Sequence, residues 1–472
     1  MAKNSDNKNR WLAFMVLCLG TLMEVLDTTI VNVALPSIRT DLHFTEASLA
    51  WIVNAYLLTF GGFLLLGGRL GDLFGHRKLF IIGIALFTLA SLACGLSNTQ
   101  WLLITARAVQ GVGGAIASAV GLSLVMDMFT KPEERARAMG YFGFIAAGGG
   151  SVGVLLGGLL TSLNWHFIFL INIPIGILVV VLSNVLLPQT KGSGSHHLDI
   201  AGAITVTSSL LLTVYAIVNG NEVGWTSIQT IGILAASLFL MATFLFIESH
   251  IKSPLVPLSL FKIRNVAVAN IVGVLWAAAM FAWFFISALY LQLVLGYSPL
   301  QVGLGFLPAN LIMGAFSLGL SAKLVMRYGI KKPLSVGLLS AAIGLVLFFR
   351  APVEGNFVTD VLPSMILLGF GAGMAFNPML LAAMNDVPPD ESGLASGLVN
   401  TAFMMGGALG LAILASIAAS RTQSLLLSGT PQIEAINGGY HTAFLVGGIF
   451  ALCASALAGS LLRIHPLKNS KN

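Results

Sequence analysis

Residues 67–78 read GGRLGDLFGHRK, and residues 321–332 read SAKLVMRYGIKK. Each stretch stands between two long apolar runs. When Gly75 is aligned with Gly329, cationic residues coincide at three further positions. A short cationic loop between apolar runs is typical of the cytoplasmic face of a membrane protein. Because the same kind of loop occurs twice, the sequence predicts two related halves of one membrane-spanning protein.

The composition supports a membrane protein and excludes several other classes. Of the 472 residues, 57% are hydrophobic and 9% are charged, whereas soluble domains carry about 25% charged residues. A soluble enzyme, a disordered regulator and a nucleic-acid-binding protein are therefore excluded as interpretations. The formal net charge of +6 comes from Lys and Arg between the apolar runs, which indicates a cationic face on a protein embedded in the lipid bilayer.

The apolar runs define the predicted topology. A helix that crosses the bilayer needs about 20 mostly apolar residues, and fourteen runs meet this requirement. They lie approximately at residues 11–36, 47–68, 79–97, 101–128, 138–161, 166–187, 200–219, 228–248, 266–295, 299–325, 333–350, 361–385, 394–420 and 441–462. With the N-terminus inside, nearly all of the 24 Lys and Arg residues fall in cytoplasmic segments. Both termini are therefore expected in the cytoplasm.

The predicted fold class is an all-α polytopic membrane protein made of two bundles. Residues 1–187 form an N-terminal six-helix bundle, residues 188–264 a linker with two extra helices, and residues 265–472 a C-terminal six-helix bundle and tail. Two related bundles with a site between them are typical of transporters that work by alternating access.

Three ionisable residues lie deep within predicted spans, where a charge is costly and indicates function. Glu24 and Asp27 share one face of the first span because they are three residues apart. Arg107 in the fourth span lies about one helical turn from Asp27 in depth, within reach of an Arg side chain. Burial favours the neutral acid and a nearby Arg favours the carboxylate, so these acids can load and release protons. The alternative is a static Asp27–Arg107 pair that locks two helices.

Other polar and aromatic side chains within the spans are candidates for the wall of a substrate cavity, because aromatic faces attract cations. Ordinary helix packing is the alternative for each of them. The C-terminal half has no acid in the middle of a span, so neutral or monocationic lipophilic substrates are expected. Asp127, Glu248 and Asp386 lie at cytoplasmic span ends, where we expect them to be solvated. The predicted cavity comprises Glu24, Asn54, Tyr56, Trp283, Phe285, Tyr290, Gln292, Asn310, Asn377 and Asn400.

The fifth span carries a stripe of glycines. Gly149, Gly153 and Gly157 recur every four residues, and Gly158 follows directly. Small residues at this spacing let two helices approach closely. The stripe is equally compatible with a surface on which the two bundles slide and with static packing.

No nucleotide, metal or disulfide site is indicated. The segments GVGGA (111–115) and GGGSVG (148–153) lack the GK[ST] ending of a P-loop. The three Cys stand apart in separate apolar runs, and the His residues show no ligand spacing. We therefore expect no cofactor and no catalysis, and the proton gradient is the expected source of energy.

Four segments together resemble a known family. They are LDTTIVNVALP (26–36), GGRLGDLFGHRK (67–78), RAVQGVGGA (107–115) and NWHFIFLINIPIG (164–176). The chain resembles the major facilitator superfamily, and within it the fourteen-span drug:proton antiporters of the EmrB/QacA type. The resemblance covers nearly the whole chain and implies the major facilitator fold.

The resemblance also implies roles for particular residues. It implies that Asp27 and Arg107 take part in proton coupling, with Glu24 as an addition to the first-span motif. It further implies that the loop after the second span latches the outward-open state through Asp72 and Arg77, and this loop also contains Arg69 and Gly75.

One departure bears on the direction of transport. The antiporter motif of the fifth span reads G-P-x-x-G-G, and here Val154 takes the place of the Pro in GVLLGG (153–158). The leading prediction is a proton-coupled exporter of lipophilic drugs in a bacterial cytoplasmic membrane, with a monomer as the working expectation. The alternative is a proton symporter, or a lipid or metabolite facilitator, on the same fold.

Overall fold

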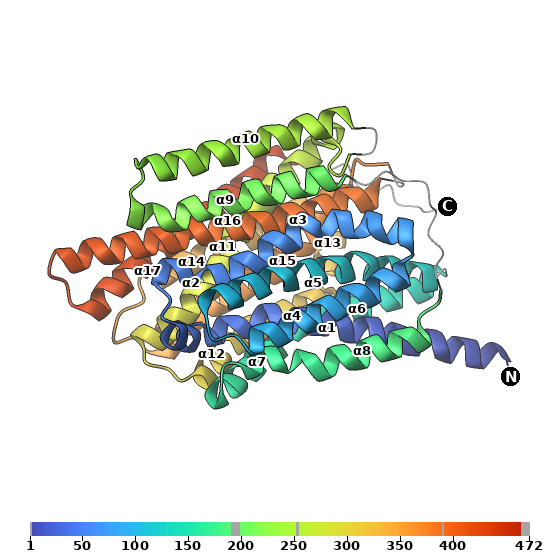
Figure 1. The fold of residues 1–472 in the computed structure, drawn as a ribbon, viewed down its shortest axis with the longest axis horizontal. Helices are drawn as coiled ribbons and strands as arrows, with labels where there is room; N and C mark the ends of the chain where they lie inside the picture. The colour runs from blue at the N-terminus through green and yellow to red at the C-terminus, as the bar shows by residue number, and fades with distance from the viewer. Residues whose placement is uncertain (1, 130, 190–198, 252–253, 389–390, 464–472) are drawn as a thin grey trace.

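The computed structural model describes residues 2–129, 131–189, 199–251, 254–388 and 391–463, and these residues contain helices but no strand. Most of the long helices run roughly parallel through one elongated bundle (Figure 1). The N-terminal part comprises α1 (Ala2–Leu42), α2 (Glu46–Leu49), α3 (Trp51–Phe74), α4 (His76–Gly95), α5 (Gln100–Met128), α6 (Pro132–Leu163), α7 (Phe167–Leu170) and α8 (Asn172–Leu186).

Two further helices separate this part from the C-terminal part: α9 (Ile200–Val223) and α10 (Ile228–His250). The C-terminal part comprises η1 (Leu258–Lys262), α11 (Arg264–Leu289), η2 (Tyr290–Val294), α12 (Pro299–Ala315), η3 (Phe316–Leu320), α13 (Ser321–Tyr328), α14 (Lys331–Phe348), η4 (Phe357–Val361), α15 (Leu362–Met384), α16 (Ser392–Leu427) and α17 (Gln432–Leu461).

The described residues contain twelve helices that are long and apolar enough to cross a membrane. Two shorter apolar helices, Gly149–Leu163 and Pro299–Ala315, lie where the sequence predicts the fifth and tenth spans. Each belongs to a longer stretch, since α6 begins at Pro132 and α12 is followed directly by η3 and α13, with a kink at Gly319, where φ is 122°. The all-helical membrane fold is confirmed, and the count of fourteen spans stays a prediction.

The two cationic loops have matching geometry, as the sequence alignment predicts. Gly75 ends α3 with φ 91°, and Gly329 ends α13 with φ 75°. In each case the glycine N–H donates to the carbonyl four residues earlier, Gly71 at 2.9 Å and Val325 at 2.8 Å. A positive φ favours glycine because other residues carry a Cβ that meets the backbone. The same turn therefore joins two helices in both halves.

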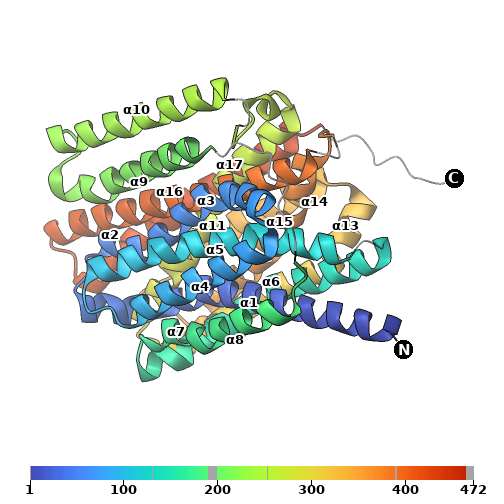
Figure 2. The same cartoon turned by 45° about the vertical axis from the view of Figure 1, so that its right-hand side comes forward.

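The extra pair α9–α10 lies along one side of the molecule, and α10 is the outermost helix (Figures 1 and 2). Helix α9 contacts both α3 from the N-terminal part and α16 from the C-terminal part. Towards α3, a Cβ on Gly62 would lie 1.9 Å from the Thr207 hydroxyl, so the two helices nearly touch. Towards α16, the Asn221 amide donates to the Ser416 hydroxyl at 2.8 Å. Helix α9 thus covers the seam between α3 and α16.

The glycine stripe of α6 faces α1, inside the N-terminal bundle. A Cβ on Gly153 would lie 2.1 Å from the Thr29 hydroxyl, and one on Gly157 would lie 3.0 Å from the Ile30 carbonyl oxygen. Gly149 likewise faces Leu22 and Val25 of α1. Only Gly158, of the four predicted stripe residues, faces the C-terminal part, where its Cβ would lie 2.7 Å from the Pro299 carbonyl oxygen. Most of the stripe therefore serves packing within one bundle, and the interpretation as a sliding surface is wrong for those residues.

We expect Gly153→Ala to destabilise the protein by about 1–3 kcal/mol, because the new methyl group overpacks the contact between α6 and α1. The measurement is thermal unfolding of the purified protein in detergent. The matched control is Gly150→Ala on the same helix, whose Cβ would meet its nearest neighbour at 3.7 Å. Equal melting temperatures for the two variants would contradict the close α1–α6 contact.

Candidate functional site

The centre of the N-terminal bundle holds a buried ion pair between α1 and α5. Arg107 Nη1 donates to Asp27 Oδ2 at 2.5 Å, and both side chains are at most 1% exposed. Arg107 Nε donates to the Ile52 carbonyl oxygen of α3 at 3.0 Å. The guanidinium also lies over the Tyr56 ring, 4.5 Å from its centroid, where a cation–π contact is favourable. The structure thus brings together the two residues that the sequence places at similar depth.

The second oxygen of Asp27 is held by two side-chain amides. Gln110 Nε2 donates to Asp27 Oδ1 at 2.7 Å, and Asn172 Nδ2 of α8 donates to the same oxygen at 3.1 Å. Gln110 also donates to the Ser91 hydroxyl of α4 at 2.8 Å, while its own Oε1 accepts from Arg107 at 2.5 Å. Every one of these side chains is buried. A buried pair is tolerated only when its remaining hydrogen-bonding capacity is satisfied, and here the carboxylate has three donors.

Sequence reasoning does not reveal the roles of Ser91 and Asn172. A lone Ser or Asn within an apolar run is common in membrane helices, and neither follows a spacing that links it to Asp27. The signals available are their polarity at membrane depth and, for Asn172, its place in the segment 164–176. Their function becomes visible because α4 and α8 pack against each other and α8 packs against α1.

Glu24 lies on α1 near Asp27 but in a different environment. Its side chain is 7% exposed, and no hydrogen bond or ion pair joins it to the part of the chain that the structure describes. Its carboxyl group interacts electrostatically with Asp27 on its own helix and with Tyr56 on α3. The two acids thus differ, because Asp27 is fully bonded and Glu24 retains its hydrogen-bonding capacity for another group.

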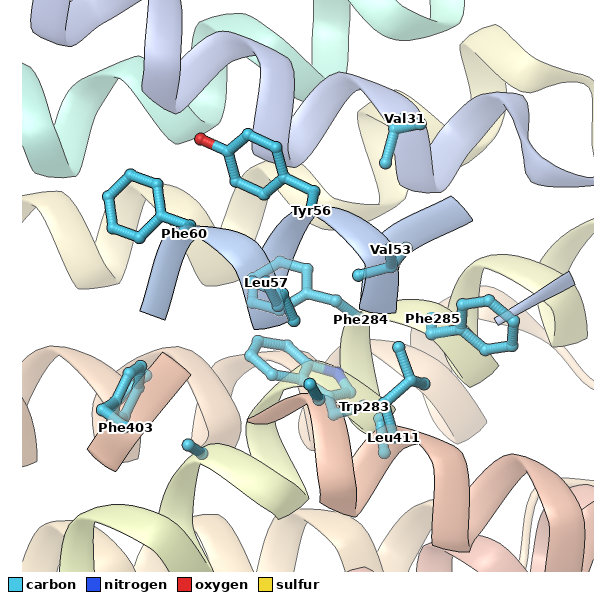
Figure 3. Close-up of a cluster of buried hydrophobic side chains, with 14 of the residues drawn as sticks. Val31, Val53, Tyr56, Leu57, Phe60, Trp283, Phe284, Phe285, Phe403 and Leu411 are labelled. Atoms are coloured by element: carbon cyan, nitrogen blue, oxygen red, sulfur yellow. The ribbon is translucent and has the colours of Figure 1, made fainter. Parts of the chain in front are cut away.

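The predicted cavity residues from α3 and α11 meet in an apolar cluster between the two bundles. Figure 3 shows Tyr56 and Leu57 of α3 on one side and Trp283 and Phe285 of α11 on the other. These side chains are nearly fully buried. Two polar groups in this region have no partner among the described residues, the Asn54 amide and the Trp283 indole N–H. In this structure the predicted cavity residues Tyr56, Trp283 and Phe285 are therefore buried in the apolar core.

Other predicted cavity residues lie elsewhere. Tyr290 belongs to the π-helical turn η2, and its hydroxyl donates to the Pro352 carbonyl oxygen at 2.8 Å within the C-terminal part. Gln292 in the same turn donates to the Val33 carbonyl oxygen of α1 at 3.0 Å and so joins the two parts. Asn310 is buried and its Nδ2 has no described partner, whereas Asn377 and Asn400 are partly exposed.

The loop between α3 and α4 makes its described contacts inside the N-terminal bundle. His76 bridges two acids, since its Nε2 lies 3.3 Å from Asp72 Oδ1 and its Nδ1 lies 3.0 Å from Asp127 Oδ2. Arg77 donates to the Asn184 carbonyl oxygen of α8. Arg69 is partly exposed near the same end of α3. The role of His76 as a bridge does not follow from the sequence pattern.

One expectation about the acids at span ends is wrong. Asp127 and Asp386 are exposed, as predicted. Glu248 is buried, and its Oε2 accepts a hydrogen bond from the Val256 backbone N–H at 3.1 Å. The chain turns back after α10 and covers this carboxyl group, which a span count does not foresee.

Within the described ranges no group of three or more His, Cys, Asp or Glu side chains is arranged to hold a metal ion. All three cysteines are free. The arrangement around Asp27 is a carboxylate held by three donors, and it contains no nucleophile paired with a base.

Comparison with known proteins agrees with this architecture. A model of the Major Facilitator Superfamily matches residues 17–411. The puromycin resistance protein pur8 of Streptomyces alboniger is 36% identical, over 94% of this chain and 90% of that protein. The cephamycin export protein CmcT of Amycolatopsis lactamdurans is 35% identical, over 96% of this chain and 93% of that protein.

Among solved structures, the inward-open xylose transporter XylE from E. coli shares the fold, with a TM-score of 0.64 and 15% identity over 97% of this chain and 98% of that one. The family match, the relatives and the fold agree with one another. The chain is a multi-pass membrane protein that belongs to the Major Facilitator Superfamily, and it is a transporter, not an enzyme.

Proposed function

We propose that this transporter exports lipophilic, neutral or monocationic drugs and exchanges them for protons. The observation that carries the proposal is the contrast between the two acids of α1. Asp27 forms a buried ion pair with Arg107, and Glu24, one helical turn away, has no described partner. An intramembrane acid that can be neutralised is the usual means of moving protons in a transporter.

The relatives support the export of drugs. Pur8 is named for puromycin resistance, CmcT for cephamycin export, and a further relative from Streptomyces glaucescens for tetracenomycin C resistance and export. Each is at least 32% identical to this chain. Membership of the family says nothing by itself about the substrate, so the resistance and export functions of these relatives are the reason for choosing drugs.

In the proposed cycle, a proton from outside neutralises an acid on α1, and the bundles rock so that substrate leaves outward. The loop containing Asp72 and Arg77 latches the outward-open arrangement. A charge contact at a helix end can stabilise one arrangement of two bundles and be released in the other. We further propose that the chain crosses the cytoplasmic (inner) membrane fourteen times, with both termini in the cytoplasm. The transport unit is a monomer.

The test is ethidium transport in energised inside-out vesicles that contain the wild-type protein. We expect accumulation that collapses when an uncoupler is added, because the proton gradient supplies the energy. For a neutral drug exchanged for one proton, a potential of 100 mV supplies about 2.3 kcal/mol, enough for a gradient of roughly fifty-fold. One-for-one exchange of a proton for monocationic ethidium moves no net charge, so the pH gradient drives it. Accumulation that persists with the uncoupler would contradict proton coupling.

A second candidate function is a proton symporter, or a lipid or metabolite facilitator, on the same fold. The observation that favours it is Val154, which replaces the Pro of the antiporter motif and lies buried in the uninterrupted helix α6. A Pro at this place would remove a helix hydrogen bond and bend α6. Substrate uptake driven by an inward proton gradient in right-side-out vesicles would favour this alternative.

A further inference from the structure

The side chain of Asn172 has a free hydrogen-bonding atom beside the proposed proton site. Its Nδ2 donates to Asp27 Oδ1 at 3.1 Å and lies 3.4 Å from the Ser91 hydroxyl. Its Oδ1 is buried and has no hydrogen-bond partner. A buried acceptor without a donor is costly. The hydrogen bonds of Nδ2 to Asp27 and Ser91 therefore have to offset this cost for the amide to keep its present orientation.

If Asp27 is protonated, its new O–H group needs a hydrogen-bond acceptor, and the side chains around Asp27 do not present one in this arrangement. The proton would bind to Oδ1, because Oδ2 is held by the cationic Arg107. Both side chains that touch Oδ1 present amide nitrogens, which only donate. Gln110 cannot turn round without losing the contact of its Oε1 with Arg107. Asn172 is the side chain on Oδ1 whose oxygen is still free.

We propose that Asn172 is a positioning residue whose side-chain amide rotates when Asp27 is protonated. With the carboxylate, Nδ2 faces Asp27 and donates. When Oδ1 of Asp27 gains a proton, the amide turns by half a rotation and its own Oδ1 accepts the new O–H. One amide atom lacks a partner in either state, and the rotation gives up the 3.4 Å contact of Nδ2 with Ser91, so the new O–H bond to Oδ1 must stabilise the turned amide. Protonation on α1 is thereby transmitted to α8.

Several other ionisable or charged groups face Asp27, and none replaces Asn172 as an acceptor. Arg107 and Tyr56 lie on α5 and α3, Cys94 lies on α4, and Glu24 lies on α1 itself. Arg107 only donates. The Cys94 thiol is directed at Gln110 Oε1, 3.8 Å away, and neither Tyr56 nor Glu24 forms a hydrogen bond with Asp27 among the described contacts.

The inference predicts shifts of different size for two neighbouring substitutions. Asn172→Ala removes a donor of the carboxylate and also the acceptor of the acid, so the two effects on the pH midpoint of protonation largely cancel. We expect this midpoint to stay within about half a unit of the wild-type value. Gln110→Ala removes a donor of the carboxylate and leaves the acceptor of the acid in place. We expect its midpoint to rise by about one unit.

The inference rests on the proposed role of Asp27 as proton carrier, and the experiment separates the two. Infrared difference spectra of the purified, full-length protein are recorded across a pH titration, and the carboxylic C=O band that vanishes in Asp27→Asn is followed. We expect this band to move to higher frequency in Asn172→Ala, because the acid has lost its hydrogen bond. Asn172→Leu, which fills a similar volume, replaces Asn172→Ala if the latter does not fold.

The outcomes are distinct. A nearly unchanged midpoint for Asn172→Ala with its C=O band moved to higher frequency, together with a higher midpoint for Gln110→Ala, supports the inference. An equal rise of the midpoint in both variants, with the C=O band of the Asn172 variants unmoved, shows that Asn172 is only a donor and overturns the inference. If Asp27→Asn leaves every titrating band unchanged, Asp27 does not bind a proton, and the proposed function fails whatever Asn172 does.

Discussion

Asp27→Asn is expected to abolish uphill drug transport, reducing ethidium accumulation in energised inside-out vesicles to the level of empty vesicles. The amide cannot carry a proton, so the gradient no longer drives the cycle. Substrate exchange down its own gradient should survive, because Asn retains an oxygen that accepts from Arg107. The two assays on the same vesicle preparation therefore separate coupling from substrate passage.

The same substitution leaves Arg107 buried at 1% exposure without its counter-charge. Breaking a buried pair on one side costs about 3–5 kcal/mol, because the remaining charge is uncompensated. A loss of activity could therefore reflect unfolding. The control is the double variant Asp27→Asn/Arg107→Gln, which removes both charges. We expect it to regain most of the melting temperature lost by Asp27→Asn and to remain inactive in uphill transport.

Two results would contradict this account. Full uphill activity of Asp27→Asn would exclude Asp27 as the proton carrier. Recovery of uphill activity in the double variant would show that Asp27 serves only to neutralise Arg107, as a static pair that locks α1 to α5.

The sequence was informative where a charge stands in an apolar run. A charge at membrane depth is so costly that the apolar background alone makes Asp27 and Arg107 candidates for one site, and the helix rise places them within reach of each other. The cationic loops around Gly75 and Gly329 identify the two halves for the same reason, because polar signals stand out against a uniform apolar background.

Neutral polar residues and packing directions could not be predicted in this way. Asn172 and Ser91 complete the Asp27 site, but a neutral amide or hydroxyl costs too little in a membrane helix to mark a function. The glycine stripe around Gly153 has a clear spacing, yet spacing does not say which neighbour the stripe faces. Helix periodicity fixes the relative directions of side chains on one helix, and the partner helix is decided by the packing of all the others.

Glu24→Gln is expected to separate cationic from neutral substrates. The Glu24 carboxyl group has no described hydrogen-bond or ion-pair partner and interacts electrostatically with Tyr56, so a monocation bound beside it would gain an ionic contact. Removing about 2 kcal/mol of such a contact in a medium of intermediate dielectric weakens binding roughly thirty-fold. Ethidium transport should fall accordingly, while transport of a neutral lipophilic drug such as chloramphenicol should stay within about two-fold.

Glu24→Asp is the matched control, because it keeps the charge and shortens the side chain by one methylene. We expect it to retain part of the ethidium activity and all of the neutral-drug activity. Equal losses for both drugs in Glu24→Gln would instead assign Glu24 to proton coupling beside Asp27, since a shared driving force affects every substrate alike. Undiminished ethidium transport would show that Glu24 serves neither substrate recognition nor proton coupling. The aromatic faces of Tyr56 and Trp283 would then have to recognise the monocation alone.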